Sequence, residues 1–256
     1  MSAPASVIAL YDIRLELDLM PKYLFYFSKA ESVRWLGHLD ILRAFERAVR
    51  RAELPIAFTL GFNPRVRINF ASALSTGITG SAEPAVIELV EALSPAEVEA
   101  RLNAVLPPGL RVSGCTEIPE SGKRDLLNAF DQAEYDFVCA SPLEYSEDAI
   151  EAAVRDLLRL PEILITRERE ARTKTINIRP MISELKFVSR DAKNGRLSLN
   201  AVVSIGQAGN VKPGDLASAL SSLLPGLTLR RAHRVRLLST QEADAFDVTP
   251  SAQNIT

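Results

Sequence analysis

The chain has 256 residues, of which 47% are hydrophobic and 24% are charged, and its formal net charge is −2 at pH 7. This composition is typical of a folded globular protein and excludes wholesale disorder. The nearly balanced charge excludes a global basic field, so any site for a polyanion must be a local patch.

The length is sufficient for two domains of ordinary size. We expect an N-terminal extension over residues 1–20, a first domain over 21–120 and a second over 133–240. The break falls in a polar stretch, and residues 241–256 are expected to form a disordered tail.

The first half predicts six elements in the order strand, helix, strand, strand, helix, strand. The strands are expected at 23–29, 66–71, 85–93 and 110–118, and the first helix at 38–52 with Leu39, Leu42, Phe45 and Val49 at helical spacing. Ser94 as N-cap and Pro95 at the first helical position predict the second helix, which a Pro-Pro-Gly run ends.

The second half repeats this order. Strands are expected at 133–140, 183–189, 196–205 and 227–238, and helices begin after Ser146 and at Gly214. Asn194-Gly195 predicts the turn between the two middle strands, and residues 160–180 are an insertion that reads as a basic hairpin. The prediction is an α+β fold of two tandem ferredoxin-like (βαββαβ) domains, with that hairpin inserted in the second.

Common catalytic and phosphate-binding motifs are absent from the sequence: there is no GxxxxGK[ST], GxGxxG, HExxH or GxSxG. The glycines of "TGITG" (76–80) resemble a KH-domain GxxG loop only superficially, and a turn before a strand is the preferred interpretation.

No metal site is predicted. Cys115 and Cys139 lack metal-ligand spacing, and they are expected to be buried small hydrophobes in a reducing cytoplasm. The two histidines, His38 and His233, are remote in sequence. No apolar run is long enough to span a membrane, and we expect a cytoplasmic protein with no membrane partner.

The helix predicted at 38–52 carries the first candidate site. Asp40 falls at its third position, where a carboxylate favours the exposed N–H groups. A set of arginines lies before and along the helix: Arg34, Arg43, Arg47, Arg50 and Arg51. An anion- or partner-binding surface and a solvated face explain this set equally well. For His38, capping or packing is preferred to proton transfer.

Two further basic segments are candidates for RNA or anion binding. The first is a turn with an aromatic residue that could stack on a base, and it comprises Phe62, Asn63, Arg65 and Arg67. The second is the inserted hairpin, with Lys174, Asn177 and Arg179 as its candidate residues. A loop held by Phe62, and edge-strand charges that deter aggregation, are the competing interpretations.

Residues from Met20 to about Leu238 resemble a known family. "HLDILRAFERAVRRAELP" followed by "GFNPR", and "KTINIRP" at 174–180, are similar to the radical-SAM-associated proteins of the DUF2344 family, found alone or fused behind a radical SAM domain. The resemblance implies a radical SAM protein as partner and makes Met20 a candidate for the native start. Because this chain lacks three closely spaced cysteines, the iron–sulfur cluster and S-adenosylmethionine are expected only on that partner. No cofactor is expected in this chain.

Three functions are compatible with these observations. The leading hypothesis is a non-catalytic RNA- or substrate-binding accessory protein of a radical SAM enzyme, acting in RNA modification. The second is an enzyme acting on RNA, with His38 and Asp40 in acid–base roles. The third is a structural protein–protein adaptor.

Overall fold

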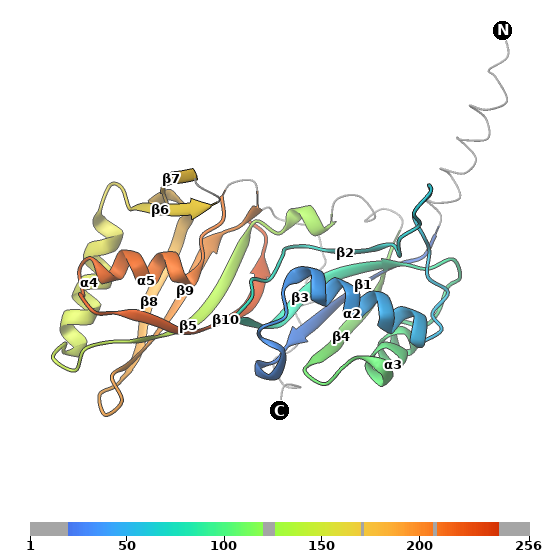
Figure 1. Ribbon diagram of the computed structural model, residues 1–256, viewed down its shortest axis with the longest axis horizontal. Coiled ribbons are helices and arrows are strands. Elements are labelled where there is room, and N and C mark those ends of the chain that lie inside the picture. Colours follow the sequence, from blue (N-terminus) through green and yellow to red (C-terminus); the bar gives the residue numbers. More distant parts are fainter. Residues whose placement is uncertain (1–19, 120–125, 170–171, 207–208, 241–256) are drawn as a thin grey trace, which may run out of the picture.

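The computed structural model describes residues 20–119, 126–169, 172–206 and 209–240 (Figure 1). The extension expected at 1–20, apart from Met20, and the tail expected at 241–256 lie outside the described residues.

The first half follows the predicted order of elements. Its strands are β1 (Lys22–Lys29), β2 (Ile68–Phe70), β3 (Ile78–Glu88) and β4 (Leu110–Ile118), and its helices are α2 (His38–Arg51) and α3 (Pro95–Val105). A short 3-10 turn, η1 (Glu31–Val33), precedes α2, and another, η3 (Leu126–Ala129), leads out of this half.

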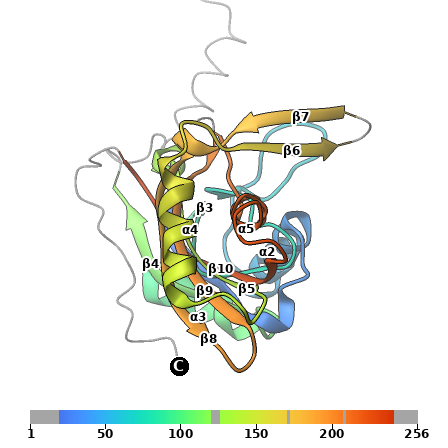
Figure 2. The same cartoon turned by 90° about the vertical axis from the view of Figure 1, so that its left-hand side faces the viewer.

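The second half begins with β5 (Gln132–Ala140) and α4 (Glu147–Arg159). The inserted hairpin consists of β6 (Leu164–Arg169) and β7 (Arg172–Asn177), which pair antiparallel as predicted. The turn η4 (Arg179–Met181), the strands β8 (Ile182–Asp191) and β9 (Arg196–Ser204), the helix α5 (Pro213–Ser221) and the strand β10 (Thr228–Leu238) complete it. Figure 2 shows the hairpin projecting beyond the helices.

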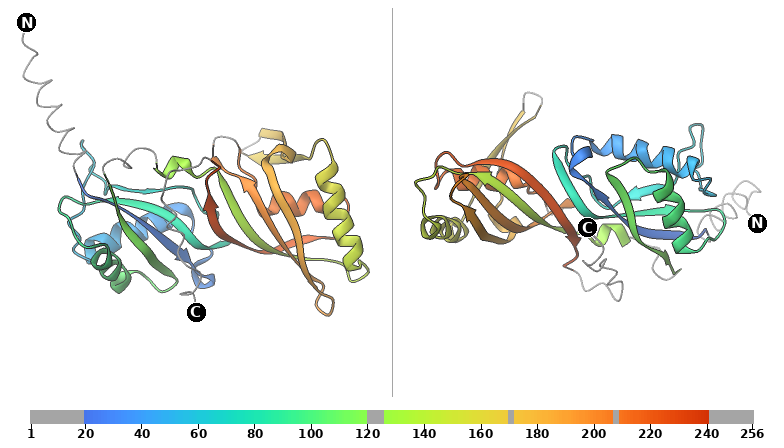
Figure 3. Two further views of the ribbon diagram at one scale, coloured as in Figure 1. Left: turned by 180° about the vertical axis from the view of Figure 1, so that it is seen from behind. Right: turned by 90° about the horizontal axis from the view of Figure 1, so that it is seen from below.

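A single sheet of eight strands runs through both halves, in the order β4-β1-β3-β10-β5-β9-β8, with β2 also paired to β3. Every pairing in it is antiparallel except the parallel contact of β3 with β10, which joins the two halves. The helices lie on one face of this sheet, and from behind the strands stand in front of them (Figures 1 and 3). The α+β class is therefore confirmed.

Helix starts agree with the capping signals in the sequence. The hydroxyl of Ser94 accepts a hydrogen bond from the Glu97 N–H, and that of Ser146 accepts one from the Ala149 N–H. At α2 the side chain of Asp40 accepts from the N–H of Gly37, the N-cap residue, at 3.0 Å. The predicted role of Asp40 at the third helical position is confirmed.

Two main hydrophobic cores lie on the helix side of the sheet. The first packs Phe25, Phe27 and Phe45 between β1 and α2, and the second packs the β5 residues Tyr135 and Phe137 beneath α4 and α5. A small third cluster lies on the opposite face of the first half, where η3 covers it.

Two local predictions were wrong. Leu39 was grouped with Leu42, Phe45 and Val49 by its spacing, yet it is 61% exposed. The buried face of the helix is centred on Ile41, Phe45 and Ala48, and Leu39 lies about 200° around the helix from Ile41. The strand predicted at 85–93 runs from Ile78 to Glu88, because Gly80 pairs with Lys29 of β1 and extends the strand toward its N-terminal end. A Cβ on Gly80 would lie 2.5 Å from Oε1 of Glu83, so this glycine makes room for a buried carboxylate.

Candidate polyanion-binding surface on helix α2

The side of α2 that faces away from the sheet carries a row of exposed residues. Leu39, Arg43, Arg47 and Arg50 fall within about 80° of the helix circumference at 3.6 residues per turn, opposite the buried face. We call these four residues the outer stripe. It is apolar at the N-terminal end of the helix and cationic over the rest of its length.

The arginine side chains of α2 differ in their hydrogen-bond and ion-pair partners. Arg43 lies 3.8 Å from the exposed carboxylate of Asp40, and Arg51 donates to the carbonyl oxygen of Val105 at the end of α3. Arg47 and Arg50 form no hydrogen bond or ion pair within the described part of the chain, not even with Glu46, which lies four residues before Arg50. Arg47 and Arg50 are therefore the guanidinium groups of this helix most available to an external anion.

Trp35 is a surface feature that the sequence analysis did not single out. It lies in the turn before α2 and is 67% exposed, and the guanidinium carbon of Arg34 lies 4.5 Å from the centroid of its ring. Arg34 is fixed in turn by Glu31, at 2.6 Å. The clue in the sequence was a tryptophan outside any apolar periodicity and next to an arginine.

His38 and Asp40 have structural partners. The ring of His38 packs edge-on against Phe70 at 5.7 Å between centroids, while Asp40 caps the helix and pairs with Arg43. The two side chains do not contact each other. These contacts agree with the packing and capping interpretation and supply no acid–base dyad.

The loop between α2 and β2 exposes part of its candidate set. Phe62, Asn63 and Arg65 are exposed at its tip, and Phe62 is the most exposed large hydrophobic residue among the described ones. Arg67 is half-buried and donates to the buried carboxylate of Glu88 at 2.5 Å, so it stabilises the strands rather than presenting a free charge.

In the inserted hairpin only one of the three candidate residues is exposed. Lys174 faces solvent, whereas the side-chain oxygen of Asn177 accepts hydrogen bonds from the N–H groups of Ile163 and Arg179. The guanidinium of Arg179 donates to the carbonyl oxygens of Leu158 and Ile182. Arg179 is therefore anchored in the second half, and among the described residues no hydrogen bond joins it to His38, Asp40 or Arg65.

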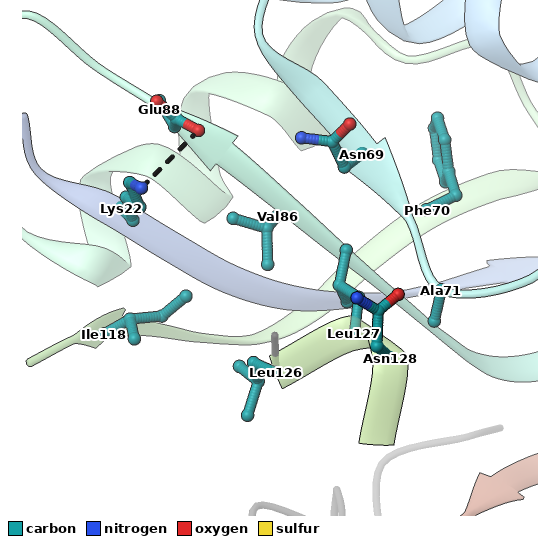
Figure 4. Close-up of a pocket in the computed structure, with 10 residues that line it drawn as sticks. All are labelled: Lys22, Asn69, Phe70, Ala71, Val86, Glu88, Ile118, Leu126, Leu127 and Asn128. Carbon is teal, nitrogen blue, oxygen red and sulfur yellow. Dashed lines mark ion pairs between the residues drawn. The ribbon is translucent and has the colours of Figure 1, made fainter. Parts of the chain in front are cut away.

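A cavity of about 340 Å³ opens on the face of the sheet opposite α2 (Figure 4). Val86, Ile118, Leu126 and Leu127 provide its apolar lining, and Lys22 and Glu88 lie at one end as an ion pair 3.8 Å apart. The Glu88 carboxylate is also paired with Arg67, so it is already held by two cations.

Three buried charged residues meet where the two halves join. Arg234 of β10 donates to Glu83 of β3 at 2.8 Å, and both side chains are almost fully buried. Lys29 of β1 is also fully buried and donates to the carbonyl oxygens of Leu36 and Ser75; burial lowers the pKa of its amine to about 8, although the neighbouring Glu83 opposes this shift. Sequence patterns did not indicate this cluster.

On the other face of the same junction, each ring nitrogen of His233 forms a hydrogen bond with a hydroxyl group of β3. Its Nδ1 lies 2.8 Å from the Thr79 hydroxyl and its Nε2 lies 2.6 Å from the Ser81 hydroxyl. Burial lowers the pKa of this imidazole, against an opposing effect of Asp136 and Glu83. The hydroxyl partners favour a neutral ring that connects β10 to β3.

The cysteines do not suit a metal or a cluster. Cys115 on β4 and Cys139 on β5 are free thiols separated by three intervening strands of the sheet, and burial raises the pKa of each to about 12. Cys139 is buried as expected, whereas Cys115 is only partly buried. No group of three or more metal-ligating side chains occurs among the described residues, and none of the helices described there is both long and apolar enough to cross a membrane.

A chain of one solved complex shares the fold of this protein at low sequence identity. The chain in "Crystal Structure of a Cbf5-Nop10-Gar1 Complex" matches 90% of this chain with a TM-score of 0.50 and 11% identity. Chains of an archaeal box H/ACA sRNP Nop10-Cbf5 complex and of an H/ACA RNP bound to a substrate RNA containing 2'-deoxyuridine match the same share, each with a TM-score of 0.47 and with 13% and 10% identity. The present chain covers 53%, 52% and 51% of these chains, about half their length.

A search of curated protein sequences found no match. The profile of the family described as "Uncharacterized protein conserved in bacteria (DUF2344)" matches residues 22–213, more than half of the 256-residue chain. This match includes α2, its arginines and the inserted hairpin, and the protein belongs to the DUF2344 family.

Proposed function

We propose that this protein is a non-catalytic RNA-binding accessory protein of a radical SAM enzyme in the cytoplasm, and that the outer stripe of α2 is the surface that holds the RNA. The observation that carries the proposal is the pair of exposed guanidinium groups, Arg47 and Arg50, which lie on one side of α2 without an internal counter-ion in the described part of the chain.

Arginine suits this role better than a solvated helix face requires. Its planar guanidinium can donate two parallel hydrogen bonds to a phosphate, whereas lysine would serve equally well for solubility. Arg43, Arg47 and Arg50 follow one another along about two turns of helix, so their spacing allows them to contact successive phosphates of one strand. Lys174 and Arg65, which are exposed elsewhere on the molecule, remain candidate contacts.

The roles of His38 and Asp40 support a binding rather than a catalytic function. Both residues are used in packing or capping, and neither contacts the other. The three-cysteine ligand set of a radical SAM cluster does not fit this chain, because its two thiols are protonated and lie on separated strands. We therefore assign the cluster and S-adenosylmethionine to the partner protein.

We also infer that each half is a ferredoxin-like unit, with domains at 21–120 and 133–240. The strand order supports this inference: the fourth strand of each half lies beside the first, the first beside the third, and the second at the far side, as in β4-β1-β3-β2 and β10-β5-β9-β8. The β6–β7 hairpin is then the insertion in the second unit.

RNA binding is tested by its dependence on salt and on the outer stripe. If three arginines neutralise three phosphates of a single strand, the logarithm of the association constant falls with the logarithm of salt concentration at a slope of about −2. We expect the double variant Arg47→Glu/Arg50→Glu to lose most of its affinity for a cellular RNA fraction at low salt, measured by fluorescence anisotropy.

The matched control is Arg155→Glu, an exposed arginine on α4 in the other half, which should bind like the unaltered protein. Equal binding by the double variant, or no RNA binding by the folded protein at low salt, would overturn the proposal. Recovery of an acidic protein on the intact stripe in the second case would support the adaptor function instead. Copurification with a radical SAM protein separately tests the assigned partner.

A further inference from the structure

We propose that Trp35, with Arg34, is a base-stacking platform at the N-terminal end of the outer stripe, and that the RNA held by α2 is therefore single-stranded. This inference rests on the proposed RNA-binding function and adds the class of RNA that the site takes.

The first observation is the exposure of Trp35. Tryptophan is a large apolar side chain that contributes most when it is buried, yet two thirds of this one faces solvent. It is followed by Leu39, also mostly exposed, at the start of α2. An exposed aromatic ring beside arginines is the combination that binds unpaired bases, since every base offers a π face to the ring and a phosphate to the guanidinium.

The second observation is that the ring of Trp35 lies over a glycine, Gly77, that leaves space for it. Gly77 has a φ of +82°, and a Cβ on it would lie 3.3 Å from Cζ3 of the indole. The backbone N–H of Gly77 donates to the carbonyl oxygen of Arg34 at 2.8 Å, which ties the turn carrying Trp35 to the start of β3. The ring therefore occupies the space that the missing side chain of Gly77 leaves open, beside a turn that a backbone hydrogen bond fixes.

The third observation is the arrangement of charge around the platform. Arg34 stacks on the indole and is oriented by Glu31, and Arg231 of β10 approaches the same carboxylate to 3.7 Å. Two arginines from different halves thus surround one glutamate, which leaves a net positive charge beside the ring. Together with the arginines of the outer stripe, this favours a polyanion carrying flat rings over an uncharged apolar protein segment.

These contacts select for single strands. In a duplex the base faces are covered by stacking, so a protein helix can reach phosphates but the ring of Trp35 would find no free base. A single strand can lay phosphates along Arg43, Arg47 and Arg50 while one base lies against Trp35 or against the guanidinium stacked on it.

Trp35 is the single tryptophan of the chain, so its fluorescence reports on this site alone. The experiment titrates the full-length protein at low salt with a 12-nucleotide oligoadenylate, with a duplex of the same length, and with inorganic polyphosphate, which has charge but no bases. We expect oligoadenylate to quench Trp35, while the duplex and polyphosphate bind without comparable quenching. We expect Trp35→Leu to weaken oligoadenylate binding roughly tenfold and to leave polyphosphate binding unchanged.

The control is Val188→Ala, which changes an exposed apolar residue on β8 and should bind oligoadenylate normally. If oligoadenylate binding depends on Arg47 and Arg50 but neither quenches Trp35 nor weakens in Trp35→Leu, the platform is wrong and the proposed RNA-binding function stands. If oligoadenylate and the cellular RNA fraction both fail to bind, the RNA-binding function itself fails, and with it the platform. Equal affinity for the duplex and the single strand would also overturn the platform.

Discussion

At the scale of single residues, Gly77 links the backbone to the proposed platform. Its left-handed φ of +82° is strained for any residue with a Cβ, and the ring of Trp35 occupies the space above it. We expect Gly77→Ala to lower the free energy of unfolding by about 1–2 kcal/mol. We also expect a change in the emission maximum of Trp35, because the ring must move by a few tenths of an ångström or more.

Thermal unfolding and the fluorescence spectrum of the folded variant measure the two effects. Gly61→Ala is an informative comparison, since that glycine also has a positive φ, +125°, but nothing lies within 4 Å of its added Cβ. It should lower stability without changing the Trp35 spectrum. An unchanged Trp35 emission spectrum in Gly77→Ala would show that the position of the ring does not depend on this glycine.

Lys29 is expected to make stability depend on pH. Its pKa is about 8 when folded, because burial disfavours the charged amine, against 10.5 for an ordinary lysine. Between these two values the unfolded chain holds a proton that the folded protein has released, so the free energy of unfolding rises with pH, by at most about 1.4 kcal/mol per pH unit. Below pH 8 the folded protein carries the cost of the buried cation.

Urea denaturation at pH 7.5 and 9.5 tests this dependence in the unaltered protein and in Lys29→Met. The two thiols act in the opposite direction above about pH 9, since burial raises their pKa to about 12, but they are common to both proteins. We expect the stability of Lys29→Met, relative to the unaltered protein, to fall as the pH rises. A difference that is the same at both pH values would contradict a lowered pKa for Lys29.

At the scale of secondary structure, the exposed and the anchored arginines should behave differently. Arg179 donates to two backbone carbonyl oxygens near the base of the hairpin, whereas Arg47 on α2 has no described partner. Removing Arg179 leaves carbonyl groups without their donor, and we expect Arg179→Ala to lower the free energy of unfolding by about 1–3 kcal/mol with RNA affinity unchanged.

Arg47→Ala should have the reverse effect, with weaker RNA binding and stability within about 0.5 kcal/mol of the unaltered protein. Chemical denaturation and fluorescence anisotropy on the same two variants compare them directly. Loss of RNA affinity in Arg179→Ala at full stability would return Arg179 to the set of contact residues predicted from the sequence.

Most elements could be predicted because their signals are local. The caps at Ser94, Ser146 and Asp40, and the Asn194-Gly195 turn, depend on side chains within a few residues, and each lies where it was expected. The early start of β3 could not be predicted in this way. Gly80 reads as a turn residue from sequence, and its use inside a strand depends on the side chain of Glu83 and on pairing with distant residues.

The candidate surface could be predicted only in part for the same reason. The arginine row of α2 follows from helical periodicity, but which arginines are free depends on tertiary partners such as Val105, 54 residues from Arg51. The exposure of Trp35 depends on Gly77 and the start of β3, and the local sequence offers only a tryptophan beside an arginine, outside any apolar periodicity. Likewise, Asn177 and Arg179 lie in a basic segment by composition and become structural anchors only in the folded chain.

At the scale of the whole molecule, the two halves share one sheet. The sequence predicted two units in tandem, but β10 lies beside β3 and pairs with it in parallel, from Ala232–Ile78 to Arg236–Ala82. This pairing places Leu74 of the first half within the core of the second. Parallel pairing between strands about 150 residues apart leaves no local signal, and the run "RRAHRVR" reads as a solvated strand although Arg234 within it is almost fully buried.

The buried Arg234–Glu83 ion pair links β10 to β3, so we expect it to stabilise the junction of the two halves. Arg234→Met would leave the carboxylate of Glu83 buried without its hydrogen-bonded partner, although Lys29 stays close, and we expect a loss of about 3 kcal/mol or more in the free energy of unfolding. Arg236→Met, two residues along the same strand, removes a half-exposed pair with Glu134 and should cost less than about 1 kcal/mol. Urea denaturation compares the two variants, and adding Glu83→Gln to Arg234→Met should recover part of the loss because it removes the unpaired charge. Equal costs for the two arginine variants would mean that water reaches the Glu83 carboxylate and that the junction is not held by a buried ion pair.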